Sequence, residues 1–317
     1  MTTVNVADAT LGHTARAARQ LSAPRSRKRE GDAKTRNSAL IDKCERLAER
    51  GKTMLHGQST TVAKPPACAL EQSRFCIQVD PAPRARLIRA AHIETIPADK
   101  VLWHDDAPCR TVGLLVSGYL RFQRHNRDGR RQILNLTVPG DLFGHEDERN
   151  EGFSLESATE AVLCRFDRRV FDELLIEDGS LRRALYRYGS RNLDRLHWLT
   201  WTIGALRPEE RIAAFLLNAR GFLPYRDLPD GTGLISLAIS RRDIADLLAT
   251  SVETICRTFK SLGKDGLIRL LDPAHVLFLD PAGLAARAGL PDREHAPVMA
   301  SDPAVMTFIN DRPGVHR

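Results

Sequence analysis

Residues 240–259, SRRDIADLLATSVETICRTF, decide the fold. They predict two short helices joined by a tight corner, because Ser240 and Ser251 are residues that cap helix N-termini and each precedes a helix-forming run. Charged side chains fall where the second helix would face outward, and Cys256 stands among them beside Arg257. The stretch is therefore typical of a pair of helices that presents one polar face.

The residues that follow extend this unit. Gly266 stands near the end of the second helix, and residues 269–280 (RLLDPAHVLFLD) predict a hairpin with a turn at Asp272-Pro273. Two helices followed by two strands form a winged helix-turn-helix, which we expect over residues 207–290. The Pro-containing residues 291–317 are predicted to form a disordered tail.

Short strands precede this unit. Residues 111–144 alternate apolar and polar side chains, with turn sequences at Arg127-Asp128-Gly129 and Pro139-Gly140-Asp141. Residues 160–175 (EAVLCRFDRRVFDELL) predict a strand that runs into a helix. Many short strands with Gly-containing turns favour a small barrel or β-roll, so residues 67–179 are expected to form a β-roll sensor domain.

A long helix is predicted between these two domains, over residues 180–206. Its apolar and seam-compatible side chains are spaced by three and four residues, a heptad stripe with one stutter: Leu181, Leu185, Tyr188, Asn192, Leu196, Leu199, Ile203 and Leu206. Packing on its own domain would also give a stripe, but the length of the helix and the narrowness of the stripe favour a dimer seam. Pro208 is expected to begin the next helix.

Composition limits the remaining possibilities. The chain has 317 residues and a net charge of +7, all of it carried by residues 1–66, which are polar and predicted to form a disordered basic tail. A basic tail beside a neutral body suggests a polyanion partner, while a solubilising arm is the simpler alternative. Neither a membrane-spanning run nor a secretory signal is present, so we expect a cytoplasmic protein.

The second helix carries the candidate DNA-reading residues. The N-terminal part of that helix enters the major groove in a helix-turn-helix, which makes Glu253, Cys256 and Arg257 the expected base-reading residues. Arg257 could bind guanine and Glu253 could accept from cytosine; an ordinary salt bridge between the two is the alternative. The candidate phosphate contacts are Arg241, Arg242, Lys260, Lys264 and Arg269.

From about Thr95 to Gly289 the chain resembles the CRP/FNR family of bacterial transcription regulators. The resemblance rests on PGDLFG (139–144), PEERIAAFLL (208–217) and VETICRTFKSLGKDGLI (252–268). It implies an α+β architecture: a cyclic-nucleotide-binding-like β-roll, a long dimerisation helix and a C-terminal winged helix-turn-helix. It also implies a homodimeric activator that binds a TTGAT-like palindrome, with RNA polymerase as partner.

The resemblance is not complete at the recognition helix. FNR-like members carry a Glu-x-x-Ser-Arg pattern there, and this chain places Cys256 where the serine stands. The corner, which usually holds glycine, holds Ala249. A thiol beside Arg257 can be oxidised, so Cys256 is a candidate redox brake on DNA binding, with a tolerated serine substitute as the alternative.

The resemblance leaves the signal open. A cyclic nucleotide is not expected, because Gly144 and Glu146 are out of step for the ribose and no Arg is placed for the phosphate. An FNR-like iron–sulfur cluster would use Cys68, Cys76, Cys164 and an unidentified fourth ligand, although these cysteines could equally be small buried hydrophobes. A FixK-like branch, controlled by abundance, upstream regulation or thiol chemistry, is the favoured interpretation, with no certain cofactor.

Motifs typical of enzymes are missing from the sequence. No CxxC, HExxH or phosphate-binding Gly loop is present in the sequence, so an enzyme is not predicted. A small-ligand-binding, cyclic-nucleotide-like protein without a transcriptional role is the alternative of another class.

Overall fold

The computed structural model describes residues 71, 73–103, 111–145, 153–290 and 300, all within the compact unit Arg50–Arg317. The tail predicted over residues 1–66 lies outside the described residues, as does the one predicted over 291–317 except for Ala300. In the described part of the chain, none of the helices combines the length and apolar character needed to span a bilayer.

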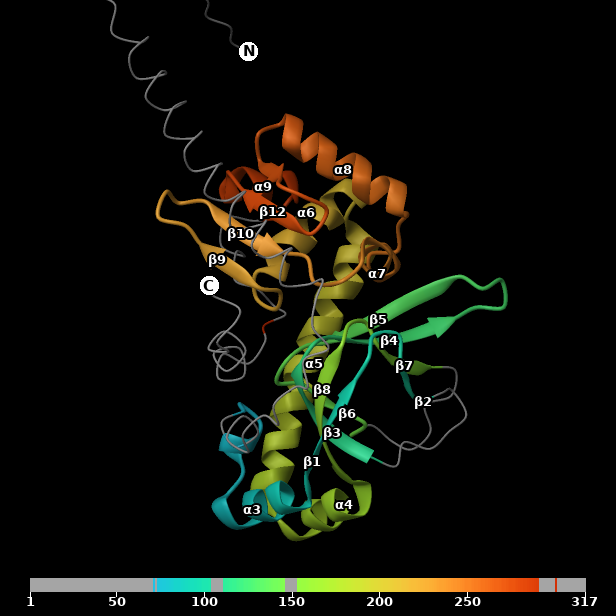
Figure 1. Cartoon of the computed structure of the whole chain (residues 1–317), viewed down its shortest axis with the longest axis vertical. Coiled ribbons are helices and arrows are strands. Elements are labelled where there is room, and N and C mark those ends of the chain that lie inside the picture. The colour runs from blue at the N-terminus through green and yellow to red at the C-terminus, as the bar shows by residue number, and fades with distance from the viewer. Residues whose placement is uncertain (1–70, 72, 104–110, 146–152, 291–299, 301–317) are drawn as a thin grey trace, which may run out of the picture. The chain divides into compact units, whose positions relative to one another are not determined.

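The N-terminal half is the predicted β-roll, built from two antiparallel four-stranded sheets (Figure 1). The first sheet has the order β1 (His92–Ile96), β8 (Ala161–Asp167), β3 (Thr111–Ser117), β6 (Leu142–Phe143). The second has the order β2 (Val101–Trp103), β7 (Ser154–Ser157), β4 (Leu120–His125), β5 (Arg131–Thr137). Leu115, Leu120 and Leu163 are fully buried in one apolar cluster of the roll, as expected for strands that alternate inward and outward side chains.

Helices cover one side of the roll. They are η1 (Cys76–Gln78), α3 (Pro81–Ala90), α4 (Arg168–Glu177) and α5 (Gly179–Ala205). Leu87, Phe171 and Leu181 from three of these helices share a second apolar cluster with Val112 of β3. Helices η1 and α3 were not predicted, because their residues show no strong apolar periodicity. The strand-to-helix run expected at 160–175 is confirmed as β8 and α4.

The long helix α5 was predicted correctly, but half of its heptad stripe is buried within the subunit and is not open to a second subunit. Leu181 and Tyr188 are buried against the roll, and Leu199 and Leu206 in the cluster that also holds the C-terminal domain. Helical periodicity identifies an apolar face without saying what covers it. A neighbouring row, which shares Leu196 and Ile203 with the stripe, is exposed, again with three- and four-residue steps: Tyr186, Gly189, Leu193, Leu196, Thr200 and, half-buried, Ile203.

The C-terminal domain begins at Pro208, the first residue of α6 (Pro208–Ala219), as predicted. Its other helices are α7 (Arg241–Leu247), α8 (Val252–Lys264) and α9 (Pro281–Arg287), and its sheet has the order β11 (Ile268–Leu270), β12 (His275–Phe278), β10 (Gly233–Ser236), β9 (Tyr225–Asp227). The predicted wing hairpin is β11 and β12; β9, β10 and α9 were not predicted. Fully buried Ile133 of β5 lies in the same apolar cluster as Phe215 and Ile244, so the roll contributes to the core of this domain.

The corner between α7 and α8 requires a left-handed residue. Ala249 adopts φ of 49°, where glycine is usual, and the Thr250 N–H donates to the Ala245 carbonyl at 3.0 Å. Both predicted caps are present: the Ser240 hydroxyl accepts from the Asp243 N–H, and the Ser251 hydroxyl from the Thr254 N–H. The caps and the left-handed residue together fix the angle between the two helices.

This geometry predicts unequal effects on stability for two substitutions at the corner. Ala249→Gly removes the steric strain of the left-handed backbone. Because glycine also raises the conformational entropy of the unfolded chain, which costs ~0.4–1 kcal/mol of stability, the free energy of unfolding should change little. Ala249→Val places a β-branched residue at positive φ and should cost about 1–3 kcal/mol. Denaturant unfolding of both variants checks this; equal stability of the two would contradict the left-handed corner.

Candidate nucleic-acid interface

Helix α8 has one buried and one exposed face. Ile255, Phe259 and Leu262 are fully buried in the core of the C-terminal domain, whereas Glu253 and Arg257 are exposed. Figure 1 shows α8 along the outer edge of this domain. The sequence therefore produces an amphipathic helix whose polar face, including its N-terminal turn, is open to a partner.

The two charged base-reading candidates are held by different neighbours. The Arg257 Nη2 donates to the Thr254 hydroxyl at 3.2 Å, and within the described residues no ion pair joins it to Glu253. Hydrogen bonds from its own backbone N–H and from Ser251 hold the pKa of Glu253 below its usual value, with a smaller contribution from the Arg257 charge. Glu253 is thus an ionised acceptor, and the salt-bridge alternative is not the arrangement found.

Cys256 lies between these two residues. It is a free cysteine and half-buried, less exposed than predicted from its place on the helix. It remains more accessible than Cys76 and Cys164, which are buried.

The candidate phosphate contacts fall into two groups. Arg242, Lys260 and Lys264 are exposed, and 77% of the Arg242 side chain is accessible. The Arg241 guanidinium is instead engaged within the domain: it lies 4.6 Å from the Phe259 ring centroid and donates to the Pro273 carbonyl at 3.1 Å. Arg241 therefore tethers the wing turn to α8, and half-buried Arg269 lies on the wing strand β11.

A buried ion cluster, which was not predicted from the sequence, joins this interface to the roll. Only 3% of the Asp243 side chain is exposed, and its carboxylate pairs with Arg121 of β4 and Arg131 of β5. Arg131 also pairs with Asp246 at 2.7 Å. No local pattern signals these pairs, because the partners are more than 100 positions apart.

The charge state of Arg121 follows from its surroundings. Burial is the largest influence and lowers its pKa, but hydrogen bonds to Asp99 and Glu156, together with the charges of Asp243 and Glu156, outweigh burial and raise the pKa. Arg121 stays cationic, with only 8% of its side chain exposed. Removing either the buried cation or the buried anion would leave the other charge uncompensated, which is strongly destabilising.

Two of the three cysteines proposed as metal ligands come together. Cys76 and Cys164 share one apolar cluster beneath the roll. Burial, with a smaller contribution from Cys76, raises the pKa of the Cys164 thiol to about 12, so the thiol is neutral. Cys68, Cys44 and Cys109 lie outside the described residues, and the described part contains no group of three or more potential ligands. Of the cysteines proposed as ligands, the described residues thus include two, whereas such a cluster takes four thiolates, and they do not by themselves form its site.

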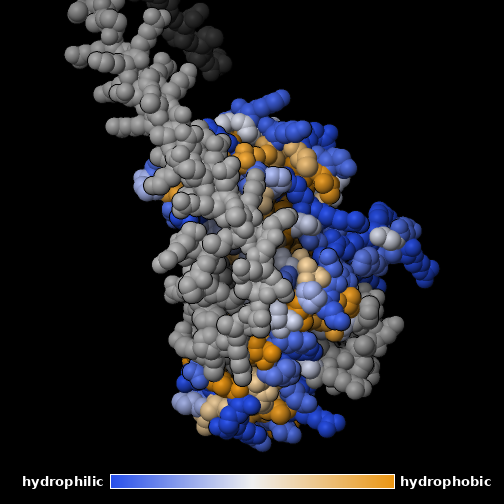
Figure 2. All heavy atoms as spheres, viewed as in Figure 1, coloured by the Kyte–Doolittle hydropathy of each residue, from blue (hydrophilic) through white to orange (hydrophobic). Residues whose placement is uncertain are grey.

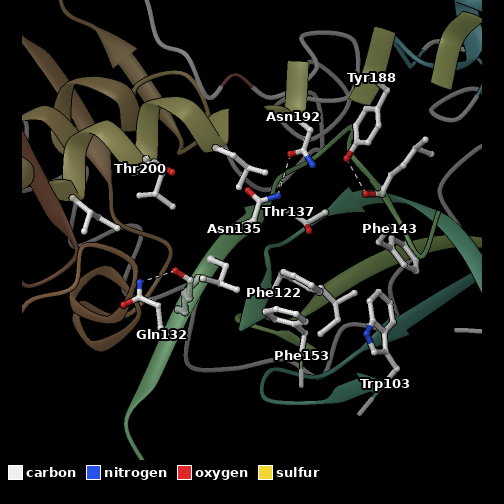
Figure 3. Close-up of a pocket in the computed structure, with 17 residues that line it drawn as sticks. Trp103, Phe122, Gln132, Asn135, Thr137, Phe143, Phe153, Tyr188, Asn192 and Thr200 are labelled. Carbon is white, nitrogen blue, oxygen red and sulfur yellow. Dashed lines mark hydrogen bonds between the residues drawn. The ribbon is translucent and has the colours of Figure 1, made fainter. Parts of the chain in front are cut away.

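A cavity of about 550 Å³ lies between the roll and α5 (Figure 3). Trp103, Phe122, Phe143 and Phe153 gather on one side of it, and across it the Asn135 amide donates to the Asn192 amide oxygen at 3.1 Å. None of the described residues that line it is charged. The described lining therefore offers no cation to a cyclic phosphate.

Comparisons with known proteins agree with this architecture. The family model described as Crp-like helix-turn-helix domain matches residues 210–287, and the one described as Cyclic nucleotide-binding domain matches residues 93–178. The transcriptional activatory protein AadR of Rhodopseudomonas palustris is 30% identical over 70% of this chain and 91% of its own length. The nitrogen fixation regulation protein FixK of Bradyrhizobium diazoefficiens is 27% identical over 70% of this chain and 92% of its own length.

Solved structures share the fold. The structure of FixK2 from Bradyrhizobium japonicum matches with a TM-score of 0.57 and 24% identity, covering 62% of this chain and 96% of that one. The chain thus combines a β-roll with a capped helix-turn-helix whose recognition face is exposed, and it matches these relatives along nearly their whole length. It therefore belongs to the CRP/FNR family and is a DNA-binding transcription regulator of the FNR/FixK type.

Proposed function

We propose that this regulator binds a TTGAT-like palindrome in double-stranded DNA, with Glu253, Cys256 and Arg257 at the base edges. The observation that carries the proposal is the exposed face of α8, on which an ionised acceptor and a guanidinium stand one turn apart. Arg can bind guanine in a bidentate fork and Glu can accept from cytosine. Relatives described as activators favour activation, with RNA polymerase as the partner, over an enzymatic role.

Phosphate contacts would surround this readout. Arg242, Lys260 and Lys264 are exposed on α7 and α8 and would supply charge rather than sequence preference. Arg241 would contribute less directly, because its guanidinium already holds the wing turn.

Arg257→Ala and Lys260→Ala, both on α8, should therefore affect DNA binding in different ways. Arg257→Ala should lose ~1–3 kcal/mol of discrimination at the half-site G·C pair, since a bidentate base contact is removed. Lys260→Ala should weaken binding to all sequences alike and reduce the salt slope by about 1. Binding titrations on specific and mismatched duplexes over a range of salt check both. Equal loss on both duplexes for Arg257→Ala would refute its assignment as a base reader.

We also propose that the exposed row of α5 forms the homodimer seam. Tyr186 and Leu193 are 79% and 50% exposed, and Leu196 is 36% exposed, which is unusual for large apolar side chains on a single helix. Three- and four-residue spacing suits the packing of two such helices side by side. A two-fold dimer would present two copies of α8 to the two halves of a palindrome.

Substitution of one seam residue should separate the subunits. Leu193→Glu places like charges opposite each other, so the protein should sediment as a monomer and lose affinity for the full palindrome. Ile176→Glu is the matched control, because Ile176 is 81% exposed on α4 and outside the row. A Leu193→Glu variant that still sediments as a dimer would rule out this seam.

Cys256 is proposed as a redox brake on DNA binding. It is the more accessible of the cysteines that the structure describes, and it stands beside Arg257 on the reading face. Hydrogen peroxide would oxidise its thiol to a sulfenic acid with release of one water, which adds bulk where the base edges pack.

Oxidation should therefore lower operator affinity only when this thiol is present. Reduced wild-type protein treated with peroxide should lose affinity and regain it with dithiothreitol, whereas Cys256→Ser should keep its affinity throughout. The readout is operator Kd before and after each treatment. Parallel losses in the two proteins would assign the effect to another group.

Two alternatives to thiol control are an iron–sulfur cluster and a cyclic nucleotide. An iron–sulfur cluster on Cys68, Cys76 and Cys164 stays a prediction, because Cys68 and the candidate fourth cysteines, Cys44 and Cys109, lie outside the described residues. Cyclic-nucleotide control, and with it a ligand-binding role without transcription, is disfavoured by the uncharged described lining of the cavity between the roll and α5.

A further inference from the structure

The hairpin formed by β4 and β5 is held against the helix-turn-helix. Arg131 pairs with Asp243 and Asp246 of α7, and the Gln132 side-chain amide donates to the Leu247 carbonyl at 3.3 Å. The Arg131 side chain is only 11% exposed. Because these contacts are buried or half-buried, the hairpin is fixed in place relative to α7.

The tip of this hairpin is ordered by its own turn. The Asn126 side-chain oxygen accepts from the N–H groups of Asp128 and Arg130, and Gly129 adopts φ of 76°. A glycine in the left-handed region closes such a turn without steric cost. Arg127 and Arg130 are thereby presented at the surface on a defined loop.

A groove of about 1060 Å³ lies between this tip and α7. It reaches Ala249 and Thr250, the corner that leads into α8. Among the described residues, its ionisable lining is mostly basic, with five arginines and one histidine against two aspartates: Arg124, Arg127, Arg130, Arg131, Arg242, His125, Asp128 and Asp246. Figure 2 shows the hydrophilic surface of the projecting hairpin and of α8 on the same side of the molecule.

These arginines are not equally engaged. Arg131 is paired within the buried cluster. Arg130 has only an exposed ion pair with Asp128 at 3.2 Å, and such a pair is weak enough for a phosphate to replace it. Arg127 makes no ion pair with the described residues, and Arg242 approaches Asp246 no closer than 4.0 Å. The groove therefore carries uncompensated positive charge beside the proposed reading helix.

The geometry points to a second DNA contact: Arg127 and Arg130 of the hairpin, with Arg242, bind phosphates of the duplex that flanks the half-site read by α8. This inference rests on the proposed function, because it needs α8 in the major groove. DNA that enters the reading face continues past it, and the basic groove opens at the corner from which α8 starts. Phosphate contacts there would add affinity and salt dependence without sequence preference.

The test compares wild-type protein with Arg127→Ala/Arg130→Ala on two duplexes. One contains the palindrome alone, and the other extends it by about one helical turn at each end. Wild type should bind the extended duplex on the order of tenfold more tightly. The double variant should lose that gain, its salt slope should fall by about 0.9 for each phosphate contact removed, and its affinity for the short duplex should stay unchanged.

Two further variants separate charge from folding. Arg127→Lys/Arg130→Lys keeps the charge and should retain most of the flank-dependent gain, since a lysine also binds phosphate. Arg89→Ala/Arg183→Ala removes the same charge from exposed positions on α3 and α5 and should behave as wild type. Melting temperatures of all variants should agree, because the substituted side chains are exposed.

The outcomes also separate the inference from the proposed function. If wild type reads the palindrome through Arg257 but gains nothing from flanking DNA, the inference is wrong and the proposed function stands. If no specific palindrome binding is found, the proposed function itself fails. Loss of transcription activation in the double variant with unchanged affinity for both duplexes would assign the hairpin to a protein partner and overturn the DNA contact.

Discussion

The carboxylate of Asp243 is the constraint on which the rest of the arrangement depends. It belongs to the first helix of the helix-turn-helix, yet it is paired with arginines from two strands of the roll and accepts a hydrogen bond from the Ser240 hydroxyl at 2.8 Å. Removing one partner from a buried pair leaves an uncompensated charge, which typically costs about 3–5 kcal/mol. The orientation of the DNA-reading unit is therefore tied to the roll, because any arrangement that separates these charges without exposing them to water is costly.

Apolar packing reinforces the same junction. Ile133 and Leu136 of β5 are fully buried in the cluster that also holds Phe215 and Ile244. The Tyr119 hydroxyl of the roll donates to the Phe222 carbonyl at 2.8 Å, and burial raises the pKa of Tyr119, which keeps this donor protonated. Apolar packing and directional pairs therefore both join the roll to the C-terminal domain at this junction, in addition to the chain connection through α5.

Local features of the fold could be predicted from the sequence because their causes are local. Ser240 and Ser251 cap helices through hydroxyls that reach backbone groups three residues away, and Pro208 begins α6 because it lacks the N–H that the first helical position leaves unpaired. The turn at Asp272-Pro273 and the hairpin turn at Gly129 could likewise be predicted, because each depends on residues adjacent in the sequence. Glu253 and Arg257 were found because their spacing sets them on one face of a helix.

Features that depend on distant partners could not be predicted. The pattern of α5 shows an apolar stripe, but its burial by the roll depends on side chains brought in from other strands and helices. Asp243 reads as an ordinary acid in a first helical turn, and only the fold places Arg121 and Arg131 beside it. The basic groove was missed for the same reason, since its arginines lie on two elements that the ion cluster brings together.

The most direct measurement is a double-mutant cycle on the pair that closes this junction. The free energy of unfolding would be determined for wild type, Arg131→Gln, Asp243→Asn and the double variant. The account predicts a coupling energy of roughly 1–3 kcal/mol, with the double variant far less destabilised than the sum of the single ones. Additive costs within ~0.5 kcal/mol would show that the two charges do not depend on each other and would contradict the account.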